Sequence, residues 1–220
     1  MRTITTLLTL LALAVPAAAQ QPPANEPGDA AIATGLPDGW LMRLDRDDAD
    51  PADVTFTPMS PGWHVATGPA AIFWRPDSRA VGEYTASATI HLMAPAEHPE
   101  AYGLFIGGRG LGGANQDYTY FLVRQTGEFL VKHRVGDETH TLIDWTAHPA
   151  VRPGDPDASV ENTLTIEAGE ERLRFLVNGT EVGVLDRPSY MDTDGVVGLR
   201  INHRLDTHVE ALTVEPAAGG

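Results

Sequence analysis

The sequence predicts an all-β protein built as an antiparallel β-sandwich, and three observations support this. From residue 40 onward, short runs place an apolar residue at every second position, which is the period of a half-buried strand. Glycine, proline, asparagine and aspartate separate these runs, and the chain contains 22 Gly and 17 Pro in 220 residues. No window shows the 3.6-residue apolar period of a helix, so crossover helices for a parallel sheet are not expected.

The predicted strands follow one another at short intervals, so that consecutive strands can pair as hairpins. More than a dozen short strands without helices indicate sheets packed face to face or closed into a barrel. In chain order, we expect strands at residues 40–45, 54–57, 63–67, 70–75, 82–93, 102–107, 117–124, 128–135, 139–144, 162–167, 172–178, 181–185, 195–203 and 208–215.

Two hairpins have clear turn sequences. Asn178-Gly179 lies between two apolar runs and predicts a type I′ turn, because both central residues of that turn need positive φ. The same residues begin the sequon Asn178-Gly179-Thr180, for which we favour the turn over glycosylation. Between 117–124 and 128–135, Gln125-Thr126-Gly127 predicts a three-residue loop with Gly127 in the left-handed conformation.

The register of this second hairpin divides its side chains between two faces. A slip of one residue would mix apolar and polar positions, so the pattern itself favours the register. We expect Phe121 to point into the core and Tyr120 to point outward. One face contains Thr119, Phe121, Val123, Phe129, Val131 and Val135, and the other contains Tyr118, Tyr120, Leu122, Arg124, Glu128, Leu130, Lys132 and Arg134.

The second face is a candidate ligand-binding surface, with a solvated sheet surface as the alternative. Tyrosine rings can stack on the apolar faces of sugars, while charged side chains bond hydroxyl groups. The predicted strand at 82–93 also alternates, with Glu83 and His91 on its polar side. We therefore predict a binding site formed by Tyr118, Tyr120, Arg124, Lys132, Arg109, Trp145, Glu83 and His91.

Several runs resemble the concanavalin A-like lectin/glucanase jelly roll, including laminin-G-like domains and exported 3-keto-disaccharide hydrolase-type domains. They include YTYFLVRQTGEFLVKHR, LRFLVNGTEVGVL and DGVVGLRINHRLDTHVEALTVE, and the likeness covers about residues 40–215. These runs are typical of the fold and contain no catalytic motif. The resemblance implies a jelly-roll sandwich, and many relatives bind or cleave carbohydrate on a concave sheet face, so a carbohydrate or related polymer fragment is the expected ligand.

Residues 108–113 read G-R-G-L-G-G and satisfy G-x-G-x-x-G. A dinucleotide-binding loop must open a helix, whereas a further strand is predicted here. We therefore expect a glycine-rich connection at the rim of the sheet, with Arg109 available to a ligand. Trp63 and Trp74 fall in strand runs and should be mostly buried, whereas Trp145 is placed in a loop and is the better binding candidate.

A catalytic role on the same scaffold is the second hypothesis. Retaining glycosidases need two carboxylates about 5 Å apart, and the E-x-D-x-x-E spacing that supplies them is absent. Carboxylates distant in sequence could still meet, so a glycan hydrolase or lyase remains open, with Tyr120, His133 or His91 as acid/base groups. A third hypothesis is a structural or adhesion module of the cell envelope, which would expose a large apolar patch.

Metal motifs are weak. The chain has no cysteine and no H-E-x-x-H, so thiolate zinc sites and Fe–S clusters are excluded, and we predict no metal or other cofactor. The acidic stretch at residues 45–53 offers oxygen ligands for Ca²⁺ but lacks the glycine and final glutamate of an EF-hand loop. A solvated acidic loop is the favoured interpretation, with calcium as the alternative.

The charge balance excludes a nucleic-acid partner. Thirty acidic residues against 15 basic ones give a net charge of −15, and this field repels phosphate backbones. The sequence leaves the oligomeric state open.

The amino-terminal segment has the pattern of an export signal. Arg2 precedes a short apolar run and the triplet Ala17-Ala18-Ala19, so residues 1–19 are predicted to be a cleaved signal peptide. The apolar run is too short for a membrane anchor, and no later segment is long enough to span a bilayer. We expect a flexible linker at 20–38, a sandwich domain at 39–216, a disordered tail at 217–220, and a periplasmic or extracellular location.

Overall fold

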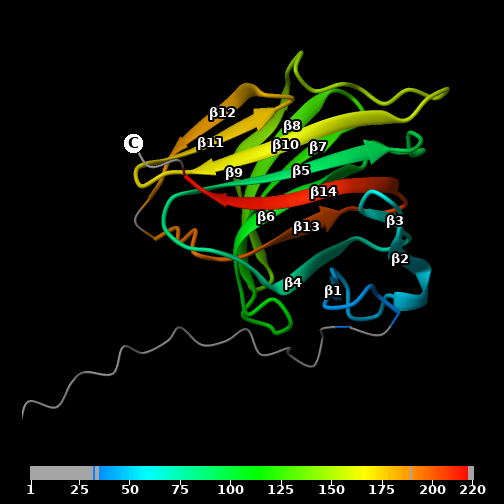
Figure 1. Ribbon diagram of the computed structural model, residues 1–220, viewed down its shortest axis with the longest axis horizontal. Coiled ribbons are helices and arrows are strands. Elements are labelled where there is room, and N and C mark those ends of the chain that lie inside the picture. The colour runs from blue at the N-terminus through cyan, green and yellow to red at the C-terminus, as the bar shows by residue number, and fades with distance from the viewer. Residues whose placement is uncertain (1–31, 33–34, 189, 218–220) are drawn as a thin grey trace, which may run out of the picture.

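Two seven-stranded antiparallel sheets pack face to face in the computed structural model (Figure 1). The structure describes residue 32, residues 35–188 and residues 190–217. The predicted signal peptide and most of the predicted linker and tail therefore lie outside the described residues. The all-β sandwich predicted from the sequence is confirmed.

The two sheets, which we call sheet A and sheet B, each combine strands from distant parts of the chain. Sheet A has the order β1 (Leu41–Leu44), β4 (Ala71–Ala80), β13 (Gly195–Ile201), β6 (Ala101–Arg109), β7 (Asp117–Arg124), β8 (Glu128–Val135), β9 (Glu138–Ala147). Sheet B has the order β12 (Thr180–Asp186), β11 (Arg172–Val177), β10 (Val160–Ala168), β5 (Tyr84–Leu92), β14 (Asp206–Pro216), β3 (Trp63–Thr67), β2 (Val54–Pro58).

The two predicted hairpins form with the expected turns. Asn178 and Gly179 have φ of 51° and 76°, so the β11–β12 connection has the positive φ values of a type I′ turn. Gly127 has φ of 84°, and Arg124 pairs with Glu128 across the β7–β8 loop. Each observed strand overlaps a predicted run, and the bounds differ by a few residues at most in all but β4, which continues to Ala80.

The main hydrophobic core lies between the sheets. Phe121 of β7 is fully buried there, and its ring lies 5.2 Å from that of Phe175 on the facing sheet. Strand β5 contributes the small residues Ala86 and Ala88 to the same core. The inward orientation predicted for Phe121 is therefore confirmed.

A second hydrophobic cluster lies on the opposite side of sheet A. Trp74, Phe105, Tyr118, Tyr120, Leu122 and Leu130 belong to this cluster and are all buried. Residues 118, 120 and 122 alternate with Phe121 and Val123 of the main core, as the period of a strand requires. The central strands of sheet A are thus apolar on both faces, unlike a strand with one solvated face.

Two local expectations need correction. Trp145 lies in strand β9 and is half-buried, whereas a loop was expected. Trp74 is buried as expected, and Trp63 packs against the main core with part of its side chain exposed. Within the predicted linker, Ile32 forms a two-way backbone bridge to Met42 on β1 (N···O 2.8 Å each way), so at this position the chain is tied to sheet A. Among the described residues, no helix is long and apolar enough to cross a membrane.

Gly198 provides a test of the second cluster. A Cβ added there would lie 2.4 Å from the carbonyl oxygen of Phe73 and 2.5 Å from the Phe105 ring. Gly198→Ala should lower the free energy of unfolding by about 1–3 kcal/mol, because a tightly packed site must shift to accept the methyl group. Urea denaturation measures this change.

Gly113→Ala is the matched control. Its added Cβ would meet nothing closer than 3.7 Å, so its unfolding free energy should stay within about 0.5 kcal/mol of wild type. Equal effects of the two substitutions would show that Gly198 is not needed for this packing.

Candidate functional site

The predicted binding surface corresponds to the outer face of sheet A, which we call the aromatic–cationic face. Strand register aligns its side chains in rows, since each strand pairs with the next. One row contains Leu41, Trp74, Gly198, Phe105, Tyr120, Lys132 and Thr141, and the next contains Arg43, Ile72, Arg200, Leu122 and Leu130. The aromatic–cationic face comprises these residues together with Asp45, Tyr118, Arg124, Glu128, Arg134 and Trp145.

A buried ion pair lies at the centre of this face. The guanidinium of Arg200 donates to both carboxylate oxygens of Asp45, at 2.9 and 2.6 Å. It also donates to the hydroxyl of Tyr118 at 3.3 Å and lies over the Tyr120 ring at 4.9 Å. Only 8% of the Arg200 side chain is exposed. A charge so far from water needs a partner, and the two-pronged geometry with Asp45 provides one.

The same contacts determine the ionisation of the neighbouring acids. Burial opposes ionisation of Asp45, but the hydrogen bonds and charge of Arg200 outweigh it and hold the Asp45 pKa below its usual value. Burial raises the pKa of Tyr118 and of Tyr120 above that of a free phenol, so both stay neutral. Arg134 lies 3.9 Å from Asp45 and adds a second positive charge.

The glycine-rich connection covers one end of the face. Leu111, in the loop between β6 and β7, is buried in the second hydrophobic cluster. Arg43 donates to the carbonyl oxygens of Leu111, at 3.4 Å, and of Gly113. Because the loop joins two antiparallel strands, it is not a dinucleotide-binding loop.

Arg109, predicted at the rim of the face, points elsewhere. Its guanidinium forms ion pairs with Asp117, at 3.0 Å, and with Asp192. Asp117 also bonds His133 at 2.8 Å and lies four residues from Phe121, on the core side of β7. Burial opposes ionisation of Asp117, but His133 and Arg109 together lower its pKa. Arg109 therefore belongs to an ion cluster at the end of the sandwich.

At the other end of the face, Arg124, Glu128 and Trp145 come together. Arg124 lies 2.6 Å from Glu128 and 4.2 Å above the centre of the Trp145 ring, within the range of a cation–π contact. Hydrogen bonds from Thr126 and Arg124 lower the pKa of Glu128. All three side chains remain partly exposed, so this cluster and Lys132 are accessible to a ligand.

The two tyrosines are less accessible than expected. Tyr118 is 1% and Tyr120 is 5% exposed, because Arg200, the covering loop and neighbouring rows enclose them. They therefore support the face from beneath and cannot stack on a sugar in this conformation. Tyr120 does point away from Phe121, as predicted.

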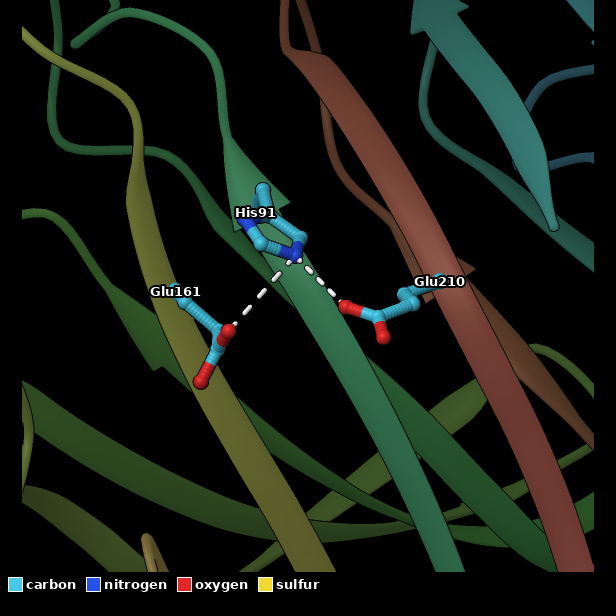
Figure 2. A group of neighbouring side chains, drawn as sticks. All are labelled: His91, Glu161 and Glu210. Carbon is cyan, nitrogen blue, oxygen red and sulfur yellow. Dashed lines mark hydrogen bonds and ion pairs between the residues drawn. The ribbon is translucent and has the colours of Figure 1, made fainter. Parts of the chain in front are cut away.

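His91 lies on the other sheet, and Glu83 lies directly before strand β5 of that sheet. His91 is on the outer face of sheet B, between Glu161 and Glu210 (Figure 2). Glu83 precedes β5 and accepts a hydrogen bond from the backbone of Glu170 at 3.0 Å. Neither residue contributes to the aromatic–cationic face, because strand β5 is in the second layer.

Arg200 and Asp45 are the residues that sequence reasoning missed here. Arg200 is the one charged residue in the run GVVGLRI of β13, and a lone arginine in a strand this apolar is a detectable indication of a buried ion pair. Its partner is 155 residues away in the chain, so no local pattern connects the two.

The carboxylates of the acidic stretch at 45–53 have separate partners. Asp45 binds Arg200, Asp48 pairs with Arg46 at 2.6 Å, and Asp50 caps the short 3₁₀ helix η1 (Pro51–Asp53). Among the described residues, the stretch contributes no group of three convergent metal ligands.

Known structures share this architecture. The carbohydrate-binding module CBM66 from Bacillus subtilis aligns with a TM-score of 0.59 at 13% identity, covering 80% of this chain and 95% of its own. A Bacillus subtilis protein of unknown function with a galectin-like fold gives 0.54 at 14% identity, covering 80% and 89%. The Emp47p carbohydrate recognition domain gives 0.51 at 10% identity, covering 87% and 94%.

The fold is a lectin-type jelly roll. The resemblance seen in the sequence is therefore confirmed at the level of architecture, and identities this low show the fold alone. No family model and no curated protein matches the sequence.

The Asp45–Arg200 pair predicts a pH-dependent stability. Asp45→Asn should lower the free energy of unfolding at pH 7 by about 3 kcal/mol, because it leaves the Arg200 charge buried without its partner. The folded-state pKa of Asp45 is lowered, so its contribution is complete above the unfolded value of about 3.9 and is lost as pH falls through the folded value. Urea denaturation at several pH values measures this difference.

Asp48→Asn is the control. Asp48 also pairs with an arginine, but it is 70% exposed, so its substitution should change stability far less than Asp45→Asn. A deficit in Asp45→Asn that did not shrink toward low pH would contradict the assignment to ionised Asp45.

Proposed function

We propose that this protein binds carbohydrate non-covalently on the aromatic–cationic face. Two of the structures with the same fold are a carbohydrate-binding module and a carbohydrate recognition domain, which makes a sugar ligand the first hypothesis for this scaffold. The observation that carries the proposal is the composition of the face itself.

Positive charge is concentrated there on an otherwise acidic protein. Arg43, Arg124, Lys132, Arg134 and Arg200 all belong to the face, against the carboxylates of Asp45 and Glu128. The whole chain has a net charge of −15. Local excess charge of the opposite sign attracts an anionic ligand and orients it.

An acidic glycan fits this face better than a neutral one. Arginine can bind a carboxylate or sulfate with two parallel hydrogen bonds, while the remaining polar groups bond sugar hydroxyls. Arg124 and Lys132 are partly exposed, and the partly exposed Trp145 side chain offers apolar surface beside Arg124. Uronic-acid or sulfated oligosaccharides are therefore the proposed ligand class.

Binding should depend on the accessible cations. Arg124→Ala and Lys132→Ala should each weaken binding of an acidic oligosaccharide by about tenfold or more, since a hydrogen bond to a charged group contributes about 1.5–3 kcal/mol. A glycan array with acidic and neutral oligosaccharides identifies the probe, and calorimetric titration measures its affinity.

Arg172→Ala is the matched control, because Arg172 is an exposed arginine on sheet B and its removal should leave affinity unchanged. Circular dichroism checks that each variant is folded. Wild-type affinity in both face variants would place the ligand elsewhere, and a complete lack of glycan binding would contradict the proposed function.

Export is a separate part of the proposal, supported by the pattern of residues 1–19. When the full chain is expressed in a bacterium with two membranes, the recovered periplasmic protein should begin at Gln20, because the A-x-A triplet ends at Ala19. Amino-terminal sequencing and intact mass measure the cleavage position. Retention of Met1 on a cytoplasmic product would contradict export.

A further inference from the structure

The outer face of sheet B has a different chemical character from that of sheet A. His91 of β5, Glu161 of β10 and Glu210 of β14 meet there (Figure 2). They come from three adjacent strands, in the order β10-β5-β14, so the imidazole lies between the two carboxylates. Among the described residues, this is the one group of three histidine or acidic side chains whose ligand atoms converge.

Two features of the backbone place the side chains together. Glu161 is paired directly with His91 across β10 and β5, so the two side chains are cross-strand neighbours. On the other side, the β5–β14 register shifts between Val209 and Ala211. Glu210 is the extra residue of this irregularity. It follows His208 by two positions, so strand alternation places both side chains on the outer face, where Glu210 contacts His91.

The distances suit a metal ion. The Nε2 atom of His91 lies 3.0 Å from Oε2 of Glu210 and 3.7 Å from Oε2 of Glu161, and the three ligand atoms lie within 4.8 Å of one another. Donors around a tetrahedral zinc ion, each about 2.0–2.2 Å from the metal, are about 3.4 Å apart. Modest rotation of the two glutamates, each 42% exposed, closes the remaining gap.

The surrounding groups leave the convergent atoms facing one another. Arg152 lies 3.6 Å from the other carboxylate oxygen of Glu161, Oε1, so it does not occupy the position facing His91. The His208 ring stacks on His91 with its centre 5.3 Å away, and its Nε2 lies 2.5 Å from the carbonyl oxygen of Pro61. His208 thus borders the cluster and fixes the orientation of the His91 ring.

We propose that His91, Glu161 and Glu210 form a site for a divalent transition-metal ion, with Zn²⁺ as the preferred ion. One imidazole nitrogen and two carboxylate oxygens are ligands that zinc accepts, and three protein ligands leave a position for water or another donor. Calcium is disfavoured because it takes oxygen ligands in larger number. The site is on a different sheet from the aromatic–cationic face, and its existence does not depend on the proposed function.

Calorimetric titration of tag-free, full-length chain with ZnCl₂ tests the site. We expect one ion per chain, and at least about tenfold weaker binding in His91→Gln, Glu161→Gln and Glu210→Gln, since each removes a ligand.

The matched control is Glu167→Gln. Glu167 lies on the same face of β10, six residues from Glu161, and is paired with Arg174 instead of a histidine. Glu167→Gln removes the same charge as the substitutions of Glu161 and Glu210, so the zinc affinity of this variant should equal that of wild type. Absence of zinc binding by the wild-type chain, or binding that the three ligand substitutions leave unchanged, would overturn the proposal. Uptake of Ca²⁺ with higher affinity than Zn²⁺ would overturn the preferred ion.

Discussion

Burial of both faces of sheet A is the constraint on which the rest of the structure depends. Strand β7 turns Phe121 toward sheet B and Tyr120 away from it, and both rings are buried. A sandwich needs one apolar face on each sheet, so a second apolar cluster on sheet A must be covered by something else. Loop residue Leu111 and the Arg200–Asp45 pair provide that cover. The exposed cations of the outer face therefore lie on a packed layer of side chains.

The outer faces of the two sheets differ in their charged groups. On sheet A, Arg124 and Lys132 remain accessible on a face where cations predominate. On sheet B, Glu161 and Glu210 lie on either side of His91. A strongly acidic chain can therefore present one surface suited to an anion and another suited to a cation. Because the apolar layer between the sheets separates the two surfaces, a substitution on one should leave the other unchanged.

The turn residues and the alternation were enough to predict the hairpins and most strands. Asn178-Gly179 and Gly127 determine local backbone conformation, which depends on neighbours in sequence. The exposure of individual side chains was harder to predict. The polar hydroxyls of Tyr118 and Tyr120 suggested a solvated face, but long-range contacts with Arg200 bury both rings. His91 lies away from the other predicted site residues because strand order places β5 in sheet B, and the guanidinium of Arg109 is held by Asp117 and Asp192.

The sequence by itself determined the strand period and the two turn types, because these follow from interactions between residues close together in the chain. The lectin-like class of fold was implied by a family resemblance. Only the tertiary structure decided which residues share a face. Asp45 meets Arg200 across 155 positions, and Glu210 meets His91 across 119. Such pairs depend on the order and register of strands within each sheet, which the alternation within a single strand does not reveal.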